Sequence, residues 1–347
     1  MKGCRVQNIA ILDDYTGAAL GSADWTQLES DFTISVFNSH FSEPETLIER
    51  LKDFEIICAM RERTPFPAEV FERLPNLKLF VTSGMRNASV DIAAAEKQGV
   101  VVCGTDGSFQ ATPEHTWGLL LACARNIHQD SNALSNGKWQ TQLGIELYGK
   151  TIGLLGLGRI GARVAEFACV FGMQIIAWSP NLTQARCDEV GVGVGLVSKD
   201  ELFKNSDFVS IHLVLGDRSR NLVNNAEFDA MKPSAFLINT SRGPIVNEDA
   251  LVEAIEKKKI RGAGIDVFEI EPLPVHHRLR QLSSLTLTPH TGYFTEEAFR
   301  TFYTQMIENI WAWKNSKPIR VLSSSSVSYT HLRAPRDTER SRMPSSA

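Results

Sequence analysis

The chain has 347 residues, more than one ordinary hydrophobic core can organise, so two domains are expected. Its 43% hydrophobic and 22% charged residues are typical of a soluble globular protein, and a formal charge of −4 without a basic block argues against nucleic acid or an anionic membrane surface as a partner. No segment approaches the roughly eighteen apolar residues of a membrane span, and the apolar run near the N-terminus is too short for a signal peptide. A cytoplasmic protein that binds small molecules is the best interpretation.

The six cysteines form no CxxC pair and lie mostly in apolar segments. This pattern predicts reduced, buried thiols of a cytosolic protein and argues against a disulfide framework or a zinc site. We therefore expect no metal. The positions concerned are Cys4, Cys58, Cys103, Cys123, Cys169 and Cys187.

The first third of the chain alternates short β-rich runs with amphipathic stretches, which predicts a small parallel α/β sheet over residues 1–103. The runs are NIAILDD, FTISVF, FEIICAM, LKLFVTSG and VVVCGT.

A long apolar helix is predicted from ATPEHTWGLLLACARNI, where Thr112 can cap and Pro113 suits the first helical position. It is interpreted as a connector between domains. The strand pattern then resumes, which predicts a second doubly wound sheet over 104–292. Its runs are KTIGLLGLGRIG, MQIIAW, DFVSIHLVL, AFLINTS, GAGIDVF and LTLTPH.

The amphipathic segment 295–315 has no strand after it, so residues 293–322 are expected to complete the first domain. Residues 323–347 carry no apolar period and are expected to form a disordered tail. The tail resembles translated vector sequence and is interpreted as non-native; a natural flexible tail remains the alternative.

The strongest local motif is GLGRIG, in which Gly156, Gly158 and Gly161 follow an apolar strand and open a helix. Gly156 permits the tight turn, Gly158 lets the backbone approach a pyrophosphate, and Gly161 lets helix and strand pack closely. A bare GxGxxG is a weak signal. With strand, turn and helix all in place, a dinucleotide site is strongly favoured over an ordinary glycine-rich turn.

The motifs GLGRIG, NTSRGPIV, GAGIDVFEIEPLP and TPHTGY occur in an order and spacing that resembles the D-isomer-specific 2-hydroxyacid dehydrogenases. The resemblance covers roughly residues 5–321. It implies a Rossmann cofactor domain inserted into a smaller flavodoxin-like substrate domain, and a homodimer. It also implies that Arg242, Glu271 and His290 occupy the catalytic positions of the family.

The chemistry of these three residues agrees with that implication. A planar guanidinium at Arg242 can hold the carboxylate and the carbonyl oxygen of a 2-oxo acid together. His290 can protonate the developing alkoxide near neutral pH, and Glu271 would orient the imidazole and favour its charged form. Each residue taken alone has a structural interpretation, as a cap, a solvated turn or a strand end. Their coincidence at strand ends favours catalysis.

By the same resemblance, further residues line the cofactor and the substrate. Asp266 would meet the nicotinamide carboxamide, while His212 is interpreted as cofactor-side packing at best. Loop 82–87 would present backbone N–H groups to the substrate carboxylate, and Arg61 and Arg86 would either meet a second anionic group or be ordinary surface charges. The cofactor set also includes Arg159, Ile160, Thr240 and Gly292, and the substrate set is Met60, Arg61, Ser83, Gly84 and Met85. The remaining histidines, His115, His128, His276, His277 and His331, are interpreted as structural.

Cofactor choice depends on the residues after the strand MQIIAW, where an NAD-preferring domain places an acid. Here Ser179, Pro180 and Asn181 follow, and no acid occurs until Asp188. A carboxylate would repel a 2′-phosphate, so its absence predicts that NADP is accepted and modestly preferred over NAD. The alternative is that Ser179 binds the 2′-OH and both cofactors work.

Two function classes remain open. The first is an enzyme that reduces a small 2-oxo acid, such as glyoxylate or hydroxypyruvate, with NAD(P)H. The second is a dinucleotide-sensing interaction protein, because the C-terminal-binding corepressors resemble this fold and retain similar residues. The enzyme is favoured because the chain carries no partner-binding extension beyond the tail.

Overall fold

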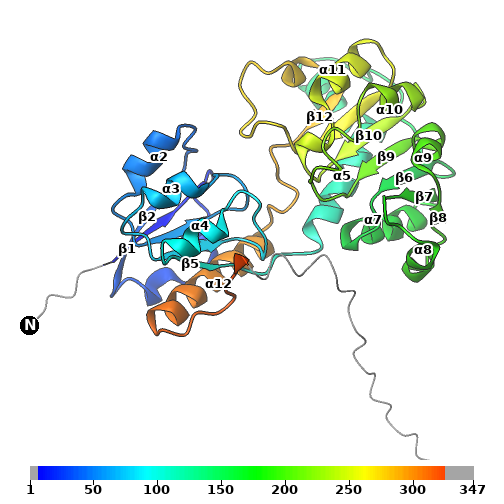
Figure 1. The fold of residues 1–347 in the computed structure, drawn as a ribbon. Helices are drawn as coiled ribbons and strands as arrows, with labels where there is room; N and C mark the ends of the chain where they lie inside the picture. Colours follow the sequence, from blue (N-terminus) through cyan, green and yellow to red (C-terminus); the bar gives the residue numbers. More distant parts are fainter. Residues whose placement is uncertain (1–6, 325–347) are drawn as a thin grey trace, which may run out of the picture. The chain divides into compact units, whose positions relative to one another are not determined.

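The computed structural model describes residues 7–324 and divides the chain into two compact units (Figure 1). Within these described residues, unit 1 contains those up to Gly107 and those from Phe299 onward, and unit 2 is Ser108–Ala298. The sequence pattern placed these boundaries at 103/104 and 292/293. Apart from Ser323 and Ser324, the predicted tail lies outside the described residues.

Unit 1 is built on five parallel strands in the order β2-β1-β3-β4-β5. This is the strand order of flavodoxin-like folds. In such folds the order in which strands are added reverses between the first and third strands, and ligands bind there, beyond the carboxyl ends of the strands. The predicted fold class is thereby confirmed for this unit. The strands are β1 Gln7–Ile11, β2 Phe32–Val36, β3 Ile56–Ala59, β4 Leu79–Thr82 and β5 Val101–Cys103.

Helices cover both faces of the first sheet, so all four residues of each inner strand β3 and β4 are buried. Figure 1 shows α2, α3 and α4 on one side and α12 on the other. The apolar face of α12 repeats at helical spacing with Phe302, Met306 and Ile310 buried. The elements are α1 Ala19–Ser22, η1 Trp25–Gln27, α2 Pro44–Leu51, α3 Ala68–Glu72, α4 Ile92–Lys97 and α12 Glu296–Lys314.

Unit 2 is built on seven parallel strands in the order β12-β11-β10-β9-β6-β7-β8. The order reverses at β6, as expected for a doubly wound Rossmann sheet. Only β8 escaped prediction, since its two residues are too short to show a pattern. The strands are β6 Thr151–Leu155, β7 Gln174–Trp178, β8 Gly195–Leu196, β9 Phe208–Ile211, β10 Phe236–Asn239, β11 Gly262–Ile265 and β12 Leu285–Leu287.

Two hydrophobic clusters lie on opposite faces of the second sheet. Leu237 packs with α9, α10 and α11, while its neighbour Ile238 packs with α5 and α7. Burial of both faces explains the continuous apolar runs in the sequence. The helices are α5 Ala111–Arg125, α6 Ile127–Ser135, α7 Arg159–Val170, α8 Gln184–Val190, α9 Lys199–Asn205, α10 Asn225–Ala230 and α11 Glu248–Glu256, with short turns η2 Gly243–Ile245 and η3 Arg278–Gln281.

Helix α5 begins earlier than predicted. Thr112 was expected to cap it, but the helix starts at Ala111 and Thr112 lies inside the first turn. The hydroxyl of Ser108 accepts hydrogen bonds from the amides of Gln110 and Ala111, each at 3.3 Å. Ser108 therefore binds the amides of the N-cap residue Gln110 and of the first helical residue, while Gln110 itself makes no side-chain capping bond.

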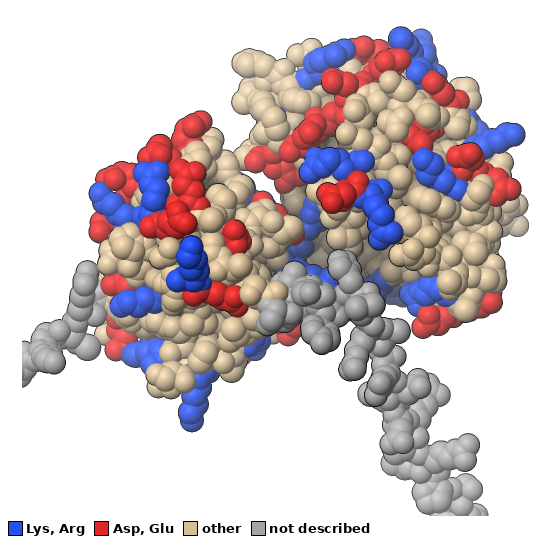
Figure 2. Space-filling view, in the orientation of Figure 1, with Lys and Arg blue, Asp and Glu red and all other residues tan. Residues whose placement is uncertain are grey.

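The surface carries both signs of charge. On the face drawn in Figure 2, basic and acidic side chains are interspersed over each unit, without a continuous basic area. Within residues 7–324, no helix is both long enough and apolar enough to cross a membrane.

Candidate active site

The glycine-rich turn between β6 and α7 has the geometry of a dinucleotide site. Gly156 has a φ of +103°, and a Cβ there would lie 2.8 Å from the carbonyl oxygen of His212. A Cβ at Gly161 would collide with the carbonyl oxygen of Gly156, whereas a Cβ at Gly158 would meet nothing within 4 Å. The first and third glycines are thus fixed by conformation and packing, and the second leaves room for a phosphate at the helix N-terminus.

Side chains around this turn come from several elements. The guanidinium of Arg159 lies 4.1 Å from the ring centroid of Phe109, and Ile160 packs on the α5–α7 cluster. His212 Nε2 lies 3.0 Å from Ser210 Oγ, and desolvation lowers the pKa of His212 to about 3. An imidazole in this state is neutral at physiological pH, so it adds no charge beside the turn.

The end of β7 presents the residues that were predicted to read the adenosine ribose. Ser179 is half-buried and Asn181 is exposed, and neither side chain makes a hydrogen bond within the described part of the chain. Arg186 lies against the glycine-rich turn, since its Nε donates to the carbonyl oxygen of Leu157 at 3.1 Å. Its second contact is an ion pair with Glu189 at 2.6 Å.

Arg242 follows β10 and leads into η2. Its NH1 donates to the carbonyl oxygen of Ser241 at 2.7 Å. The next residue, Gly243, packs so closely on the backbone of Phe268 that a Cβ would overlap it. Since β10 and β11 are adjacent parallel strands, this contact fixes the Arg242 turn to the loop after β11.

Glu271 and His290 meet at the ends of β11 and β12, which are also neighbours in the sheet. His290 Nδ1 lies 2.5 Å from Glu271 Oε2, and Glu271 Oε1 accepts the amide of Phe268 at 2.9 Å. Both side chains are partly exposed. One ring nitrogen of His290 is therefore oriented by a carboxylate, an arrangement that suits an imidazole to acid–base chemistry at its other nitrogen.

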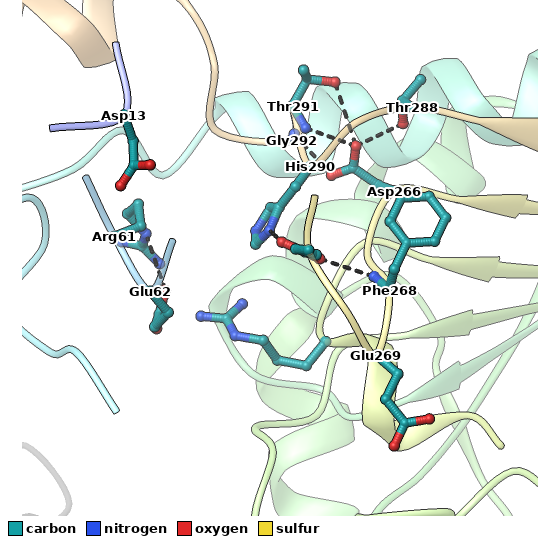
Figure 3. Close-up of polar contacts among 12 residues, drawn as sticks. Asp13, Arg61, Glu62, Asp266, Phe268, Glu269, Thr288, His290, Thr291 and Gly292 are labelled. Carbon is teal, nitrogen blue, oxygen red and sulfur yellow. Dashed lines mark hydrogen bonds and ion pairs between the residues drawn. The ribbon is translucent and has the colours of Figure 1, made fainter. Parts of the chain in front are cut away.

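Asp266 anchors the loop that carries His290 (Figure 3). Its Oδ1 accepts hydrogen bonds from the Thr288 hydroxyl at 2.6 Å and the Thr291 amide at 2.8 Å. Its Oδ2 accepts the amide of Gly292 at 2.9 Å. Burial opposes ionisation of this carboxyl, but the interactions with His115, Thr288 and Thr291 outweigh it and hold the pKa of Asp266 below its ordinary value.

Two further predicted cofactor residues follow strands of unit 2, Thr240 after β10 and Gly292 at the end of this loop. Thr240 Oγ1 lies 2.6 Å from Thr116 Oγ1 on α5, and the amide of Gly292 is bound by Asp266. Both oxygens of Asp266 therefore already accept hydrogen bonds within unit 2. Its contact with a nicotinamide carboxamide stays a prediction.

The five predicted substrate residues gather at the carboxyl ends of β3 and β4 in unit 1. Ser83 Oγ accepts the amide of Arg61 at 2.8 Å and lies 3.3 Å from Met60 Sδ. A Cβ on Gly84 would lie 2.6 Å from Arg61 NH1, and the Gly84 amide donates to Thr105 Oγ1 at 3.0 Å. The amides of Met85 and Arg86 donate no hydrogen bond to any residue between 7 and 324.

The contacts of three residues were not predicted from the sequence. Phe109 stacks on Arg159, Thr288 binds Asp266, and His115 contacts both Thr288 and Asp266. The sequence signal for Phe109 was its position before a predicted helix, which is not specific. His115 and Thr288 are separated by 173 residues, so only the folded chain joins them.

Comparisons with known proteins agree on one protein family. The model of the D-isomer specific 2-hydroxyacid dehydrogenase NAD binding domain matches residues 117–292. A hydroxypyruvate reductase of Thermotoga maritima is 35% identical over 283 residues, which cover 80% of this chain and 90% of that protein. A D-3-phosphoglycerate dehydrogenase of Methanocaldococcus jannaschii is 38% identical over 269 residues, which cover 77% of this chain.

The alignment spans only 51% of the Methanocaldococcus protein, so this chain corresponds to about half of that relative. Among solved structures, a phosphoglycerate oxidoreductase from Vibrio cholerae superposes with a TM-score of 0.84 and 36% identity. The superposition covers 89% of this chain and 99% of that one. Similarity therefore extends over both units and not only over the dinucleotide domain.

Proposed function

Since the chain belongs to the D-isomer-specific 2-hydroxyacid dehydrogenase family, we propose that it reduces a small 2-oxo acid to a D-2-hydroxy acid with NAD(P)H. Glyoxylate and hydroxypyruvate are the preferred substrates, and the reverse oxidation uses the same groups. The observation that carries the proposal is the 2.5 Å contact between His290 Nδ1 and Glu271 Oε2 in the unit that also holds the GLGRIG turn.

Arg242, His290 and Glu271 have separate roles in the proposed reaction. Arg242 binds the substrate carboxylate and the carbonyl oxygen, because its planar guanidinium offers parallel N–H donors. The reduced nicotinamide, when bound, supplies the hydride. His290 donates a proton from Nε2 to the oxygen on which negative charge develops. Glu271 orients the ring and stabilises the positive charge of the imidazolium until that proton leaves. In the oxidation direction the neutral imidazole accepts the same proton.

The substrate carboxylate is proposed to bind the loop after β4. The amide of Gly84 already donates to Thr105, so the amides of Met85 and Arg86 are the donors assigned to the carboxylate. Met60 and Ser83 support this loop from the end of β3 and β4. The guanidinium of Arg61 lies against Gly84, with its Nε 3.7 Å from Glu62 Oε2, and is proposed to meet an additional polar or anionic group of the substrate.

NADP is proposed as the modestly preferred cofactor. The end of β7 offers the hydroxyl of Ser179 and the amide of Asn181 without a carboxylate, and Arg186 lies beside the glycine-rich turn. A guanidinium at this place attracts a 2′-phosphate. The ion pair between Arg186 and Glu189 reduces that attraction, which is why the preference is modest and NAD is also accepted.

Steady-state absorbance at the NAD(P)H band tests the function directly. The protein is mixed with glyoxylate, hydroxypyruvate or pyruvate and with NADPH or NADH in turn. Turnover with at least one acid supports the enzyme. Tight binding of the dinucleotide without turnover of any acid would instead favour the second candidate, a dinucleotide-sensing interaction protein like the C-terminal-binding corepressors.

A homodimer in the cytoplasm is proposed as the working form. None of the nine residues of α6 is buried, and Ile127 and Leu134 are 55% and 60% exposed. A short helix is marginal in water without packing, which supports coverage by a second copy. Four of the five described cysteines are buried, whereas Cys169 is exposed, which departs from the prediction of buried thiols. Light scattering after size-exclusion chromatography and cell fractionation test these two statements.

A further inference from the structure

We propose that His115 is a positioning residue of the reaction, which holds the Thr288–Asp266 pair so that loop 288–292 keeps His290 in place for proton transfer. The proposal rests on the proposed function for its catalytic consequence. It changes the interpretation of His115, which the sequence pattern left as a structural histidine of α5.

The loop needs support because His290 has an unfavourable backbone conformation. Its φ is +52°, in the left-handed region that residues other than glycine seldom adopt. Such conformations persist only where the surroundings determine them. The amide of His290 is held by the carbonyl oxygens of Asp266 at 2.7 Å and Thr288 at 3.0 Å.

The carboxylate of Asp266 completes this support. It binds the loop on both sides of His290, through the Thr288 hydroxyl and through the amides of Thr291 and Gly292 (Figure 3). The carboxylate is only 1% exposed, so it depends on these donors in place of water. The position of His290 therefore depends on how firmly Asp266 itself is held.

His115 supplies the donor that comes from outside the loop. Its Nε2 lies 3.0 Å from Thr288 Oγ1 and 3.2 Å from Asp266 Oδ1. Because the Thr288 hydroxyl gives its proton to Asp266 at 2.6 Å, its oxygen can accept one from His115. An N–H at Nε2 thus fixes the direction of the Thr288 hydroxyl and adds a donor to the carboxylate.

Helix α5 also contacts the far end of the loop. The space beside the Cα of Gly292 is lined by Asp266 Oδ2, Thr112 Cγ2 and His115 Cδ2, at 3.0, 3.6 and 3.8 Å from the position of a Cβ. The first turn of α5 therefore packs on Gly292 while His115 binds Thr288. Both ends of the loop are held between α5 and Asp266.

The location of this contact gives it a role beyond local packing. Unit 2 begins at Ser108, shortly before His115, and ends at Ala298, shortly after the loop. His115 thus joins the two chain segments by which unit 2 begins and ends. Its loss is expected to disturb the proton donor without altering the glycine-rich turn, which lies on other strands.

Three variants test the proposal. His115→Phe keeps an aromatic ring and removes the donor, whereas His115→Gln places an amide N–H near the position of Nε2. His128→Phe is the matched control, because His128 is an exposed histidine of α6 in the same unit, with its Nε2 3.2 Å from Asn132 Nδ2. We expect His115→Phe to lower kcat at least about tenfold, with KM and NADPH affinity within about twofold of wild type. His115→Gln is expected to recover kcat to within about threefold, and His128→Phe to leave it unchanged.

Amide hydrogen exchange of the peptide spanning 286–294 gives a readout that does not need activity. In His115→Phe the amides of Thr291 and Gly292 should exchange at least about tenfold faster, and in the other two variants at the wild-type rate. Unchanged exchange and unchanged kcat in His115→Phe would overturn the proposal, as would a loss of kcat that His115→Gln does not reverse. A wild-type protein without activity overturns the proposed function and with it the catalytic half of this proposal, while exchange still decides whether His115 anchors the loop.

Discussion

Replacing Asp266 with asparagine tests the anchor of the loop that carries His290 with little change of shape. The less costly orientation of the new amide places Nδ2 opposite the Gly292 amide, which now lies 2.9 Å from Oδ2. One buried amide then loses its acceptor, at about 1–3 kcal/mol. The hydrogen bonds that Thr288 and Thr291 donate no longer end on a charged oxygen, which weakens each by roughly 0.5–1 kcal/mol. Removal of the buried charge offsets part of this loss.

The net destabilisation of unit 2 is expected to be about 2 kcal/mol at neutral pH, which lowers Tm by roughly 4–8 °C for a unit of this size. The pH dependence has a definite sign. The folded pKa of Asp266 lies below its ordinary value of 3.8, so its contribution is complete above that pH and is lost as pH falls through the folded pKa. The difference in Tm between wild type and Asp266→Asn should therefore be constant from pH 5 to 7 and shrink below about pH 4.

Thermal unfolding followed by circular dichroism between pH 3 and 7 measures both quantities. Asp207→Asn is a suitable control, because Asp207 is a partly exposed carboxylate of the same unit that binds the amide of Thr151 and the ammonium of Lys232. Equal Tm values for wild type and Asp266→Asn at pH 7, or a difference that persists undiminished at pH 3, would refute the reasoning.

Three further substitutions test the site. His290→Gln should lower turnover of 2-oxo acid reduction by roughly 10² or more while NADPH affinity stays near wild type, and near-normal turnover would exclude His290 as the proton donor. Arg242→Lys keeps the charge but loses the planar fork, so substrate KM should rise by the equivalent of about 2–4 kcal/mol in steady-state kinetics, and an unaffected KM would assign Arg242 a structural role. Ser179→Asp should shift kcat/KM toward NADH by at least roughly tenfold, or about 1.4 kcal/mol, and a strong NADH preference already present in wild type would contradict the proposed cofactor choice.

Sequence patterns predicted the two sheets well, because strands buried on both faces appear as continuous apolar runs. Strand β8 was missed since two residues carry no period, and the start of α5 was misplaced because the helix already begins at Ala111, before the Thr112-Pro113 pair that was expected to open it. The family resemblance is confirmed by the match over 117–292. The motifs therefore carried more information about architecture than residue-by-residue propensities did.

The site was predictable where side chains directly follow strands. Glu271 and His290 were expected near each other because parallel strands end at one edge, and they lie within hydrogen-bond distance. Their catalytic roles stay predictions. The support of His290 was not predictable, because the contact of His115 with Thr288 depends on how α5 lies across the sheet. The apolar face of a helix can be recognised from the sequence, whereas the distant loop residues that the helix contacts cannot.

The overlap that any side chain at position 243 would make with Phe268 has a consequence for how such an enzyme can change over generations. The turn that bears the guanidinium and the loop that bears Glu271 are pressed together backbone to backbone, so neither can be enlarged or shifted alone. Under the proposed function, variation that alters substrate choice would then accumulate in the loop after β4, at exposed positions such as Met85, which is 43% exposed. A saturation library at Gly243 should yield almost no active clones, whereas one at Met85 should yield many active clones that differ in the acid they prefer.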